Sequence, residues 1–515
     1  MRLVAALSAW SVRFPPRLLA GGWLAASLLA GGPVPAGPQT EELAAKAQQG
    51  KEAMAAGRFD EAASLYGAIV RALPSEPGMH MNLGMAFFMG GRPREAVPHL
   101  QTALRLKPDL LPASLFLGAA YADLGQTAKA VPPLQKFVAA QPDHHDARRM
   151  LADALLALER WGPAAQHYRV LAQQAPEDPK AWYGLERSYE GLSRHAFQTL
   201  EQTAPESPYL SLLVAEASVA QERDKSAFPL LREAIAKKTR PAEAHEALAQ
   251  IYERAGHPDW AVVEREKAKA IPPPDCRTAS LECDFRAGRY PDVLDAARPL
   301  RTAESRYWTS RAADVLAREA FDRLTALPLS PEAALVNVEV LRAQRRYEQS
   351  KEALAKAASA WPDDPRIRRE QATLLFIAHQ YAEARPLLEE LLKREPESAE
   401  LNLLLGESWV ASKEPAKAIP CLEKAVAADP DLLRARAMLG RAYLEDGQAS
   451  RAIPHLEAAL PTDEDGSLHF QLARAYRETG QAEPATRALQ AFQEVRKAHE
   501  ARLESDKQEF EITPP

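Results

Sequence analysis

Apolar and small residues recur along the chain in two short helical patterns per unit, with a turn between them. In the unit from 111 to 144, the residues expected on the inner faces of the two helices are Leu115, Gly118, Tyr121, Ala130, Leu134 and Phe137. Gly125 separates the two predicted helices, and Pro142 ends the second one. The pattern therefore predicts a helical hairpin whose apolar face needs a neighbour.

The same positions return every 34 residues, which indicates a stacked array. The repeated small residues and prolines in the first part of the chain are Gly50, Gly84, Gly118, Ala62, Ala96, Ala130, Ala164, Pro74, Pro108, Pro142 and Pro176. The period resumes at Gly406 and Gly440 near the C-terminus. Because one hairpin cannot bury its own apolar face, each must stack on the next.

This spacing of small, aromatic, glycine, alanine, large and proline positions resembles the tetratricopeptide repeat. The resemblance covers most of residues 43–498 and implies an all-α fold. We expect a right-handed superhelical solenoid of about twelve helix-turn-helix repeats.

Two segments interrupt the period and resemble each other. Residues 192–200 and 316–324 share their leucine, arginine and phenylalanine positions, and each follows an aromatic pair. Since no proline breaks these stretches, we predict one longer helix in place of a hairpin at each. An internal duplication and two independently degraded repeats explain the similarity equally well.

The interruptions and the composition suggest a division of the chain into segments. Three consecutive prolines, Pro272–Pro274, form a semi-rigid spacer and the best candidate joint between two arrays. The predicted segments are a signal peptide at 1–36, an N-terminal array at 43–275, an irregular joint at 276–330, a C-terminal array with its terminal helix at 331–508, and a tail at 509–515.

Residues 1–36 have the pattern of a secretory signal. Arg13 and Arg17 precede an apolar run from 18 to 30, and Val34-Pro35-Ala36 offers a small-residue cleavage site. The run is short for a membrane span. We therefore expect an exported protein in the periplasm or cell envelope of a bacterium. An uncleaved anchor and a misassigned start are the alternatives.

The overall charge of −6 argues against nucleic acid as a main partner, because such proteins present a basic face. No later stretch is apolar and long enough to cross a membrane, so we expect only peripheral membrane contact.

Cys276 and Cys283 could form a disulfide in an exported chain. In a continuous helix their Cα atoms would lie about 10.5 Å apart, whereas a disulfide needs less than about 7 Å. The pair therefore requires Cys276 to lie in a loop that folds back. Cys421 lies within a predicted second helix and is expected to be packed.

The sequence contains no phosphate loop, no His-Glu-x-x-His motif and no Gly-x-Ser-x-Gly motif. Two adjacent histidines, His144 and His145, fit a solvated loop better than a metal site. We therefore predict no catalytic residues, no cofactor and no metal, and a protein that is not an enzyme.

In the resembling family the first helix of each hairpin lines the concave surface. Five of the eight methionines fall between Met54 and Met89, and flexible thioethers suit a surface that accepts varied apolar partners. The candidate residues of this partner-binding groove are Met54, Met81, Met85, Phe88, Met89 and Leu115. The alternative is that these side chains belong to the repeat core.

The corresponding positions near the C-terminus are polar, with four arginines: Arg434, Arg441, Arg474 and Arg477. This surface would suit an acidic peptide or an anionic glycan. A solvated charged face is the alternative interpretation.

The expected function is that of a non-catalytic exported scaffold that binds proteins or peptides in its groove. Resembling envelope proteins help assemble secretion, outer-membrane or polysaccharide systems. The alternatives are a glycan-binding adaptor and an accessory subunit of an envelope enzyme.

Overall fold

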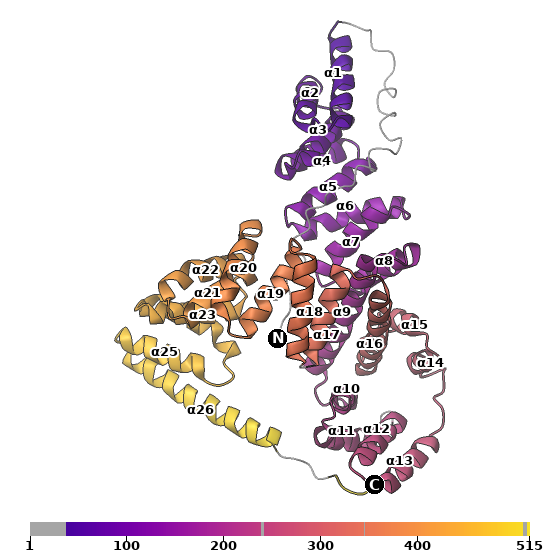
Figure 1. Cartoon of the computed structure of the whole chain (residues 1–515), viewed down its shortest axis with the longest axis vertical. Coiled ribbons are helices and arrows are strands. Elements are labelled where there is room, and N and C mark those ends of the chain that lie inside the picture. Colours follow the sequence, from indigo (N-terminus) through magenta and orange to yellow (C-terminus); the bar gives the residue numbers. More distant parts are fainter. Residues whose placement is uncertain (1–37, 238–240, 345, 508–511) are drawn as a thin grey trace. The chain divides into compact units, whose positions relative to one another are not determined.

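The computed structural model describes residues 38–237, 241–344, 346–507 and 512–515, and within these ranges it contains helices and no strand (Figure 1). The all-α repeat solenoid predicted from the sequence is confirmed. The predicted signal peptide at 1–36 lies outside the described residues. Within the described ranges, every helix is too short or too polar to cross a bilayer.

Four hairpins begin the chain, and each pairs two helices of similar length. Their bounds are α1 Pro38–Ala55, α2 Phe59–Ala72, α3 Pro77–Met89, α4 Pro93–Leu106, α5 Leu111–Asp123, α6 Thr127–Ala140, α7 His145–Ala157 and α8 Trp161–Gln174.

A long helix, α9 Pro179–Thr203, follows these hairpins, and a second one, α16 Ala303–Ala326, lies further along the chain. They contain 25 and 24 residues, so the predicted replacement of a hairpin by one long helix is confirmed at both places. The helices between them are α10 Pro208–Ala220, α11 Asp224–Ala236, α12 Pro241–Arg254, α13 Pro258–Lys269, α14 Ser280–Arg286 and α15 Tyr290–Ala297.

Five further hairpins follow α16, and the last helix is the longest. Their bounds are α17 Pro331–Ala343, α18 Tyr347–Ala360, α19 Pro365–Ile377, α20 Tyr381–Arg394, α21 Ala399–Ala411, α22 Pro415–Ala428, α23 Leu433–Glu445, α24 Ala449–Ala459, α25 Ser467–Glu478 and α26 Ala482–Lys507. Figure 1 shows α25 and α26 side by side.

The contacts divide the chain into two compact units. Among the described residues, the first comprises 38–191 and 317–327, and the second comprises the described parts of 192–316 and 328–515. The boundaries fall inside α9, inside α16 and just after α16. The joint at 276–330 stays a prediction. The long helices belong to both units because no turn interrupts them.

The close packing within a hairpin depends on the repeated glycine of the first helix. A Cβ atom at Gly118 in α5 would lie 2.5 Å from Cγ of Leu134 in α6. Leu134 is fully buried, so it has no room to move away. The turn that follows uses Gly125, whose φ of 69° is costly for other residues.

Cys276 and Cys283 form a disulfide with a Cα–Cα distance of 5.7 Å. Cys276 lies in the loop before α14, and Cys283 lies within that helix. The loop folds back as the pairing requires, because the prolines at 272–274 keep the chain out of a helix there.

This disulfide gives a simple prediction. We expect the protein, purified without reductant and then denatured, to contain one reactive thiol per chain, that of Cys421. After reduction the same assay with a thiol reagent should count three, because the chain contains three cysteines. Three thiols before reduction would contradict the disulfide.

Candidate partner-binding surfaces

A pocket of about 600 Å³ lies in the second unit, where the first helices of two consecutive hairpins, α10 and α12, meet residue 311 of α16. Its lining is mostly polar and acidic: Glu216, Val219, Ala220, Glu222, Glu243, Glu246, Ala247, Gln250, Arg254 and Arg311. Helical repeats expose such side chains because only one face of each first helix is needed for stacking.

Glu216 is at the centre of a hydrogen-bonded network in this pocket. Its carboxylate accepts from the hydroxyl of Tyr307 at 3.0 Å and pairs with Arg311 at 3.3 Å. Arg311 in turn donates to the Tyr307 hydroxyl at 2.9 Å. Burial raises the pKa of Glu216, and Arg311 opposes this shift. Because the Glu216, Tyr307 and Arg311 side chains hydrogen-bond with one another, their positions in the pocket are fixed.

The other charges around the pocket are also partly engaged. Arg254 forms a bidentate pair with Asp224, with one bond of 2.8 Å. Glu243 pairs with Arg286 at 3.1 Å, and Glu246 lies 3.4 Å from Arg265. Among the described residues no group of three or more His, Cys, Asp or Glu side chains could hold a metal. The arrangement is suited to hydrogen bonding with a partner.

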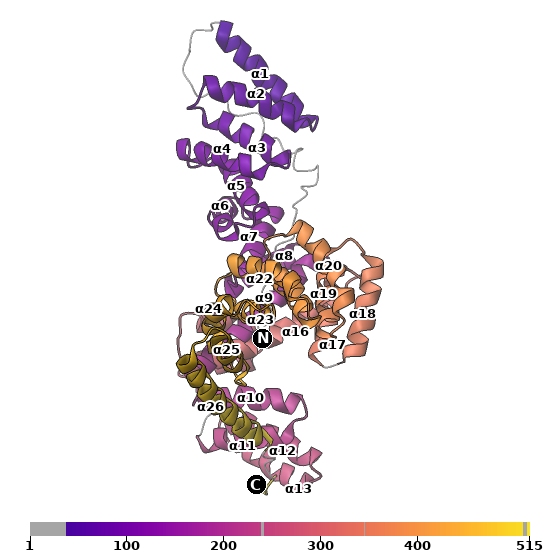
Figure 2. The ribbon, with the colours of Figure 1, turned by 90° about the vertical axis from the view of Figure 1, so that its left-hand side faces the viewer.

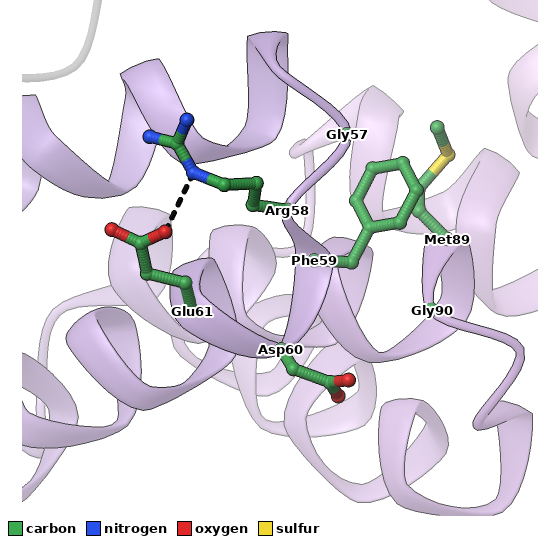
Figure 3. Close-up of a pocket in the computed structure, with 7 residues that line it drawn as sticks. All are labelled: Gly57, Arg58, Phe59, Asp60, Glu61, Met89 and Gly90. Atoms are coloured by element: carbon green, nitrogen blue, oxygen red, sulfur yellow. Dashed lines mark hydrogen bonds and ion pairs between the residues drawn. The ribbon is translucent and has the colours of Figure 1, made fainter.

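A second pocket, of about 470 Å³, lies in the first unit at the turn between α1 and α2 (Figure 3). It is lined by Gly57, Arg58, Phe59, Asp60, Glu61, Met89 and Gly90. Arg58 donates to Glu61 at 2.6 Å along one wall. Phe59 and Met89 both pack against the core cluster formed by α1, α2 and α3. They supply apolar surface beside the Arg58–Glu61 pair.

The predicted methionine-rich groove divides into buried and accessible members. Met54 is 5% exposed, and Phe88 and Leu115 are each 6% exposed, so these three contribute to packing more than to a surface. Met81, Met85 and Met89, all on α3, are partly exposed. We call these three side chains the α3 methionine surface.

Phe88 packs across repeats instead of facing solvent. Its ring lies edge-on to that of Phe116 in α5, with centroids 5.8 Å apart. Such a pair stabilises the stacking of neighbouring first helices. The sequence pattern did not separate this residue from the methionines because both positions lie on the same side of α3.

The C-terminal arginines lie on first helices as predicted, but three of them already have acidic partners. Arg434 forms a bidentate pair with Glu407 at 3.1 and 2.7 Å. Arg441 pairs with Glu445 at 2.7 Å, and Arg474 pairs with Glu478 at 2.8 Å. Arg477 is exposed. These pairs leave less positive charge for an anionic ligand than the sequence suggested.

Sequence reasoning missed the polar network and one further surface. Tyr307 lies in the aromatic pair that precedes residues 316–324, and Glu216 has no local signal because its partners lie 91 and 95 residues away. Ile512 lies in the predicted tail at 509–515. In the structure it packs against the core cluster of α10–α16.

Comparisons with known proteins agree with the repeat pattern. One family model described as tetratricopeptide repeat matches residues 48–110 and 117–179, and another with the same description matches 375–438 and 410–469. None of the curated proteins is similar enough to count as a match.

Solved structures resemble part of the chain. One is MamA, residues 41 to the end, from Desulfovibrio magneticus RS-1, with 22% identity, a TM-score of 0.30, and coverage of 33% of this chain and 96% of that one. Another is YrrB, described as a TPR protein with an unusual peptide-binding site, with 19% identity, a TM-score of 0.30, and coverage of 35% and 92%.

The repeat period, the stacked hairpins and the family models point to the same assignment. The chain carries tetratricopeptide repeats at residues 48–110, 117–179 and 375–469.

Proposed function

We propose that the protein is a non-catalytic scaffold that binds protein or peptide partners through the exposed side of its repeats. The α3 methionine surface carries this proposal. Met81, Met85 and Met89 are partly exposed on α3, and Met85 and Met89 also pack against the core cluster of α1–α3. Flexible thioethers adapt to varied apolar partners, and exposed apolar surface of this kind is typical of interaction sites.

The two pockets support a binding function for the protein. Met89 borders the pocket of Figure 3, so apolar contact and hydrogen bonding are available side by side. The Glu216 network offers prearranged polar groups in the second unit. The tetratricopeptide repeats matched in both parts of the chain support a non-catalytic role, because such arrays typically present extended binding surfaces.

We further propose that the protein is exported to the bacterial envelope and acts in assembly of an envelope, secretion or polysaccharide system. The leader pattern in residues 1–36 supports export. The Cys276–Cys283 disulfide supports an oxidising compartment. Three paired arginines in the C-terminal part make a protein partner a better candidate than an anionic glycan.

The test is replacement of Met85 by arginine. We expect Met85→Arg to reduce capture of the native partner at least tenfold, because a charged side chain would have to be desolvated at an apolar contact. Capture is measured by affinity purification of the tagged protein from its own envelope fraction and quantitative mass spectrometry.

Met85→Leu is the matched control, since it preserves apolar character and nearly the same volume. It should capture the partner as the parent protein does. Circular dichroism and thermal melting check that both variants remain folded. Equal capture by folded Met85→Arg and Met85→Leu would overturn the role of this surface.

A further inference from the structure

Residues 512–515 lie against α11 and α12 of the same unit, from which they are separated by 282 and 261 residues at the two hydrogen bonds. The hydroxyl of Tyr252 in α12 donates to the carbonyl of Thr513 at 2.8 Å. Nη1 of Arg232 in α11 donates to the carbonyl of Pro514 at 3.2 Å. Ile512 packs against the core cluster of this region. Figures 1 and 2 show the C-terminus beside α13.

The surface beneath this segment is built from aromatic rings. Tyr252 is fully buried and lies edge-on to Phe228 and to Trp260, with centroids 5.9 and 5.5 Å apart. The guanidinium of Arg232 lies 5.8 Å from the centre of the Phe228 ring, which fixes the direction of its donors. Trp260 of α13 is partly exposed and stacks on His257 at 3.8 Å. We call Phe228, Arg232, Tyr252 and Trp260 the aromatic face.

The hydrogen-bonding character of the segment and of the aromatic face is complementary. Pro514 and Pro515 have no backbone N–H, so this end of the segment offers mainly carbonyl acceptors. The aromatic face offers two donors, a phenol and a guanidinium. Proline also restricts the free peptide to extended conformations, which lowers the entropy lost on binding.

We propose that the aromatic face is a recognition site for extended segments in which an aliphatic residue is followed, two positions later, by consecutive prolines. The 512–515 segment is its resident ligand, and a partner carrying the same pattern displaces it. This inference rests on the proposed role as a peptide-binding scaffold and assigns it a second surface, distinct from the α3 methionine surface.

The contacts of the resident segment suit a ligand that exchanges. Ile512 is only partly buried, and Thr513, Pro514 and Pro515 are exposed. Its anchoring consists of one apolar side chain and two hydrogen bonds to the aromatic face. Attachment to the same chain compensates for weak contacts, because tethering gives effective concentrations of the order of millimolar.

The experiment measures binding of a fluorescein-labelled synthetic peptide with the sequence of residues 506–515 by fluorescence anisotropy. The protein is compared with a version that lacks residues 512–515. We expect the shortened protein to bind the peptide at micromolar concentrations. The longer protein should bind it at least tenfold more weakly, because its own segment competes.

Two substitutions in the shortened protein test the contacts. Tyr252→Phe removes one hydroxyl and should weaken peptide binding about threefold to tenfold. Tyr121→Phe is the matched control, because it removes a hydroxyl that bonds Gln101 in the first unit. A peptide with Ile512→Asp should bind neither protein.

Each outcome either supports the proposal or overturns it. No peptide binding by the shortened protein, equal binding by both lengths, or equal effects of Tyr252→Phe and Tyr121→Phe would overturn it. Met85→Arg should leave peptide binding unchanged. Loss of partner capture in Met85→Arg without any peptide binding would refute the aromatic face alone and preserve the scaffold function.

Discussion

Replacing Trp308 by alanine should lower the free energy of unfolding of the second unit by about 3–5 kcal/mol. Trp308 is fully buried in α16 and belongs to the core cluster shared by α10–α16. Its indole lies 5.1 Å from the ring of Phe285 and 4.9 Å from that of Tyr307, centroid to centroid. Alanine would leave a large cavity that rings held in helices cannot fill by small shifts.

Hydrogen exchange followed by mass spectrometry is the suitable measurement, because repeat arrays do not always unfold in one step. Amides of α10–α16 should lose protection while those of α1–α8 retain it. Trp361→Ala is the matched control: this tryptophan is partly exposed and should cost no more than about 1–2 kcal/mol. Equal loss of protection in the two variants would contradict the central position of Trp308.

Replacing Gly118 by valine should destabilise the first unit by about 2–3 kcal/mol. The new Cβ would lie 2.5 Å from Cγ and 2.8 Å from Cδ2 of Leu134, and 3.4 Å from the carbonyl oxygen of Ala130. Leu134 is fully buried, so α5 and α6 would have to separate. Hydrogen exchange of the amides of α5 and α6, followed by mass spectrometry, measures the effect.

Gly67→Val in α2 is the control for this substitution. A Cβ at Gly67 meets only the end of the Arg71 side chain, at 3.7 Å. The change is therefore expected to stay within about 0.5 kcal/mol, since valine and glycine differ little in helix propensity on this scale. A Gly118→Val protein as stable as Gly67→Val would show that the helices do not depend on the small residue.

The repeating part of the fold is predictable because its determinants are local. Gly118 and Leu134 lie close together in the sequence, and their contact joins the two helices of one hairpin. The same contact recurs in other repeats that keep the period. The two long helices could be predicted for the same reason, because an uninterrupted stretch without proline does not form a turn. Such signals lie within a single 34-residue repeat of the sequence.

The binding surfaces are less predictable because they depend on distant partners. The pairing of Arg434 with Glu407 joins two repeats, and the contact of Thr513 with Tyr252 spans 261 residues. Whether a methionine is covered also depends on its neighbours: Met54 is buried, whereas Met85 is partly exposed, although both fit the same pattern. The 34-residue period predicts on which face of a helix a residue lies, but it does not predict which other side chains cover that residue.

The central claim is that partners bind to the exposed side of the first helices, and site-specific photocrosslinking tests it most directly. A photoreactive amino acid is placed at Met85 of α3 or at Arg94, which is exposed on α4 of the same hairpin. After irradiation of intact cells, crosslinked products are identified by mass spectrometry. We predict a reproducible protein partner from position 85 and none from position 94. Equal crosslinking at both positions, or none at position 85, would contradict the scaffold function proposed for this protein.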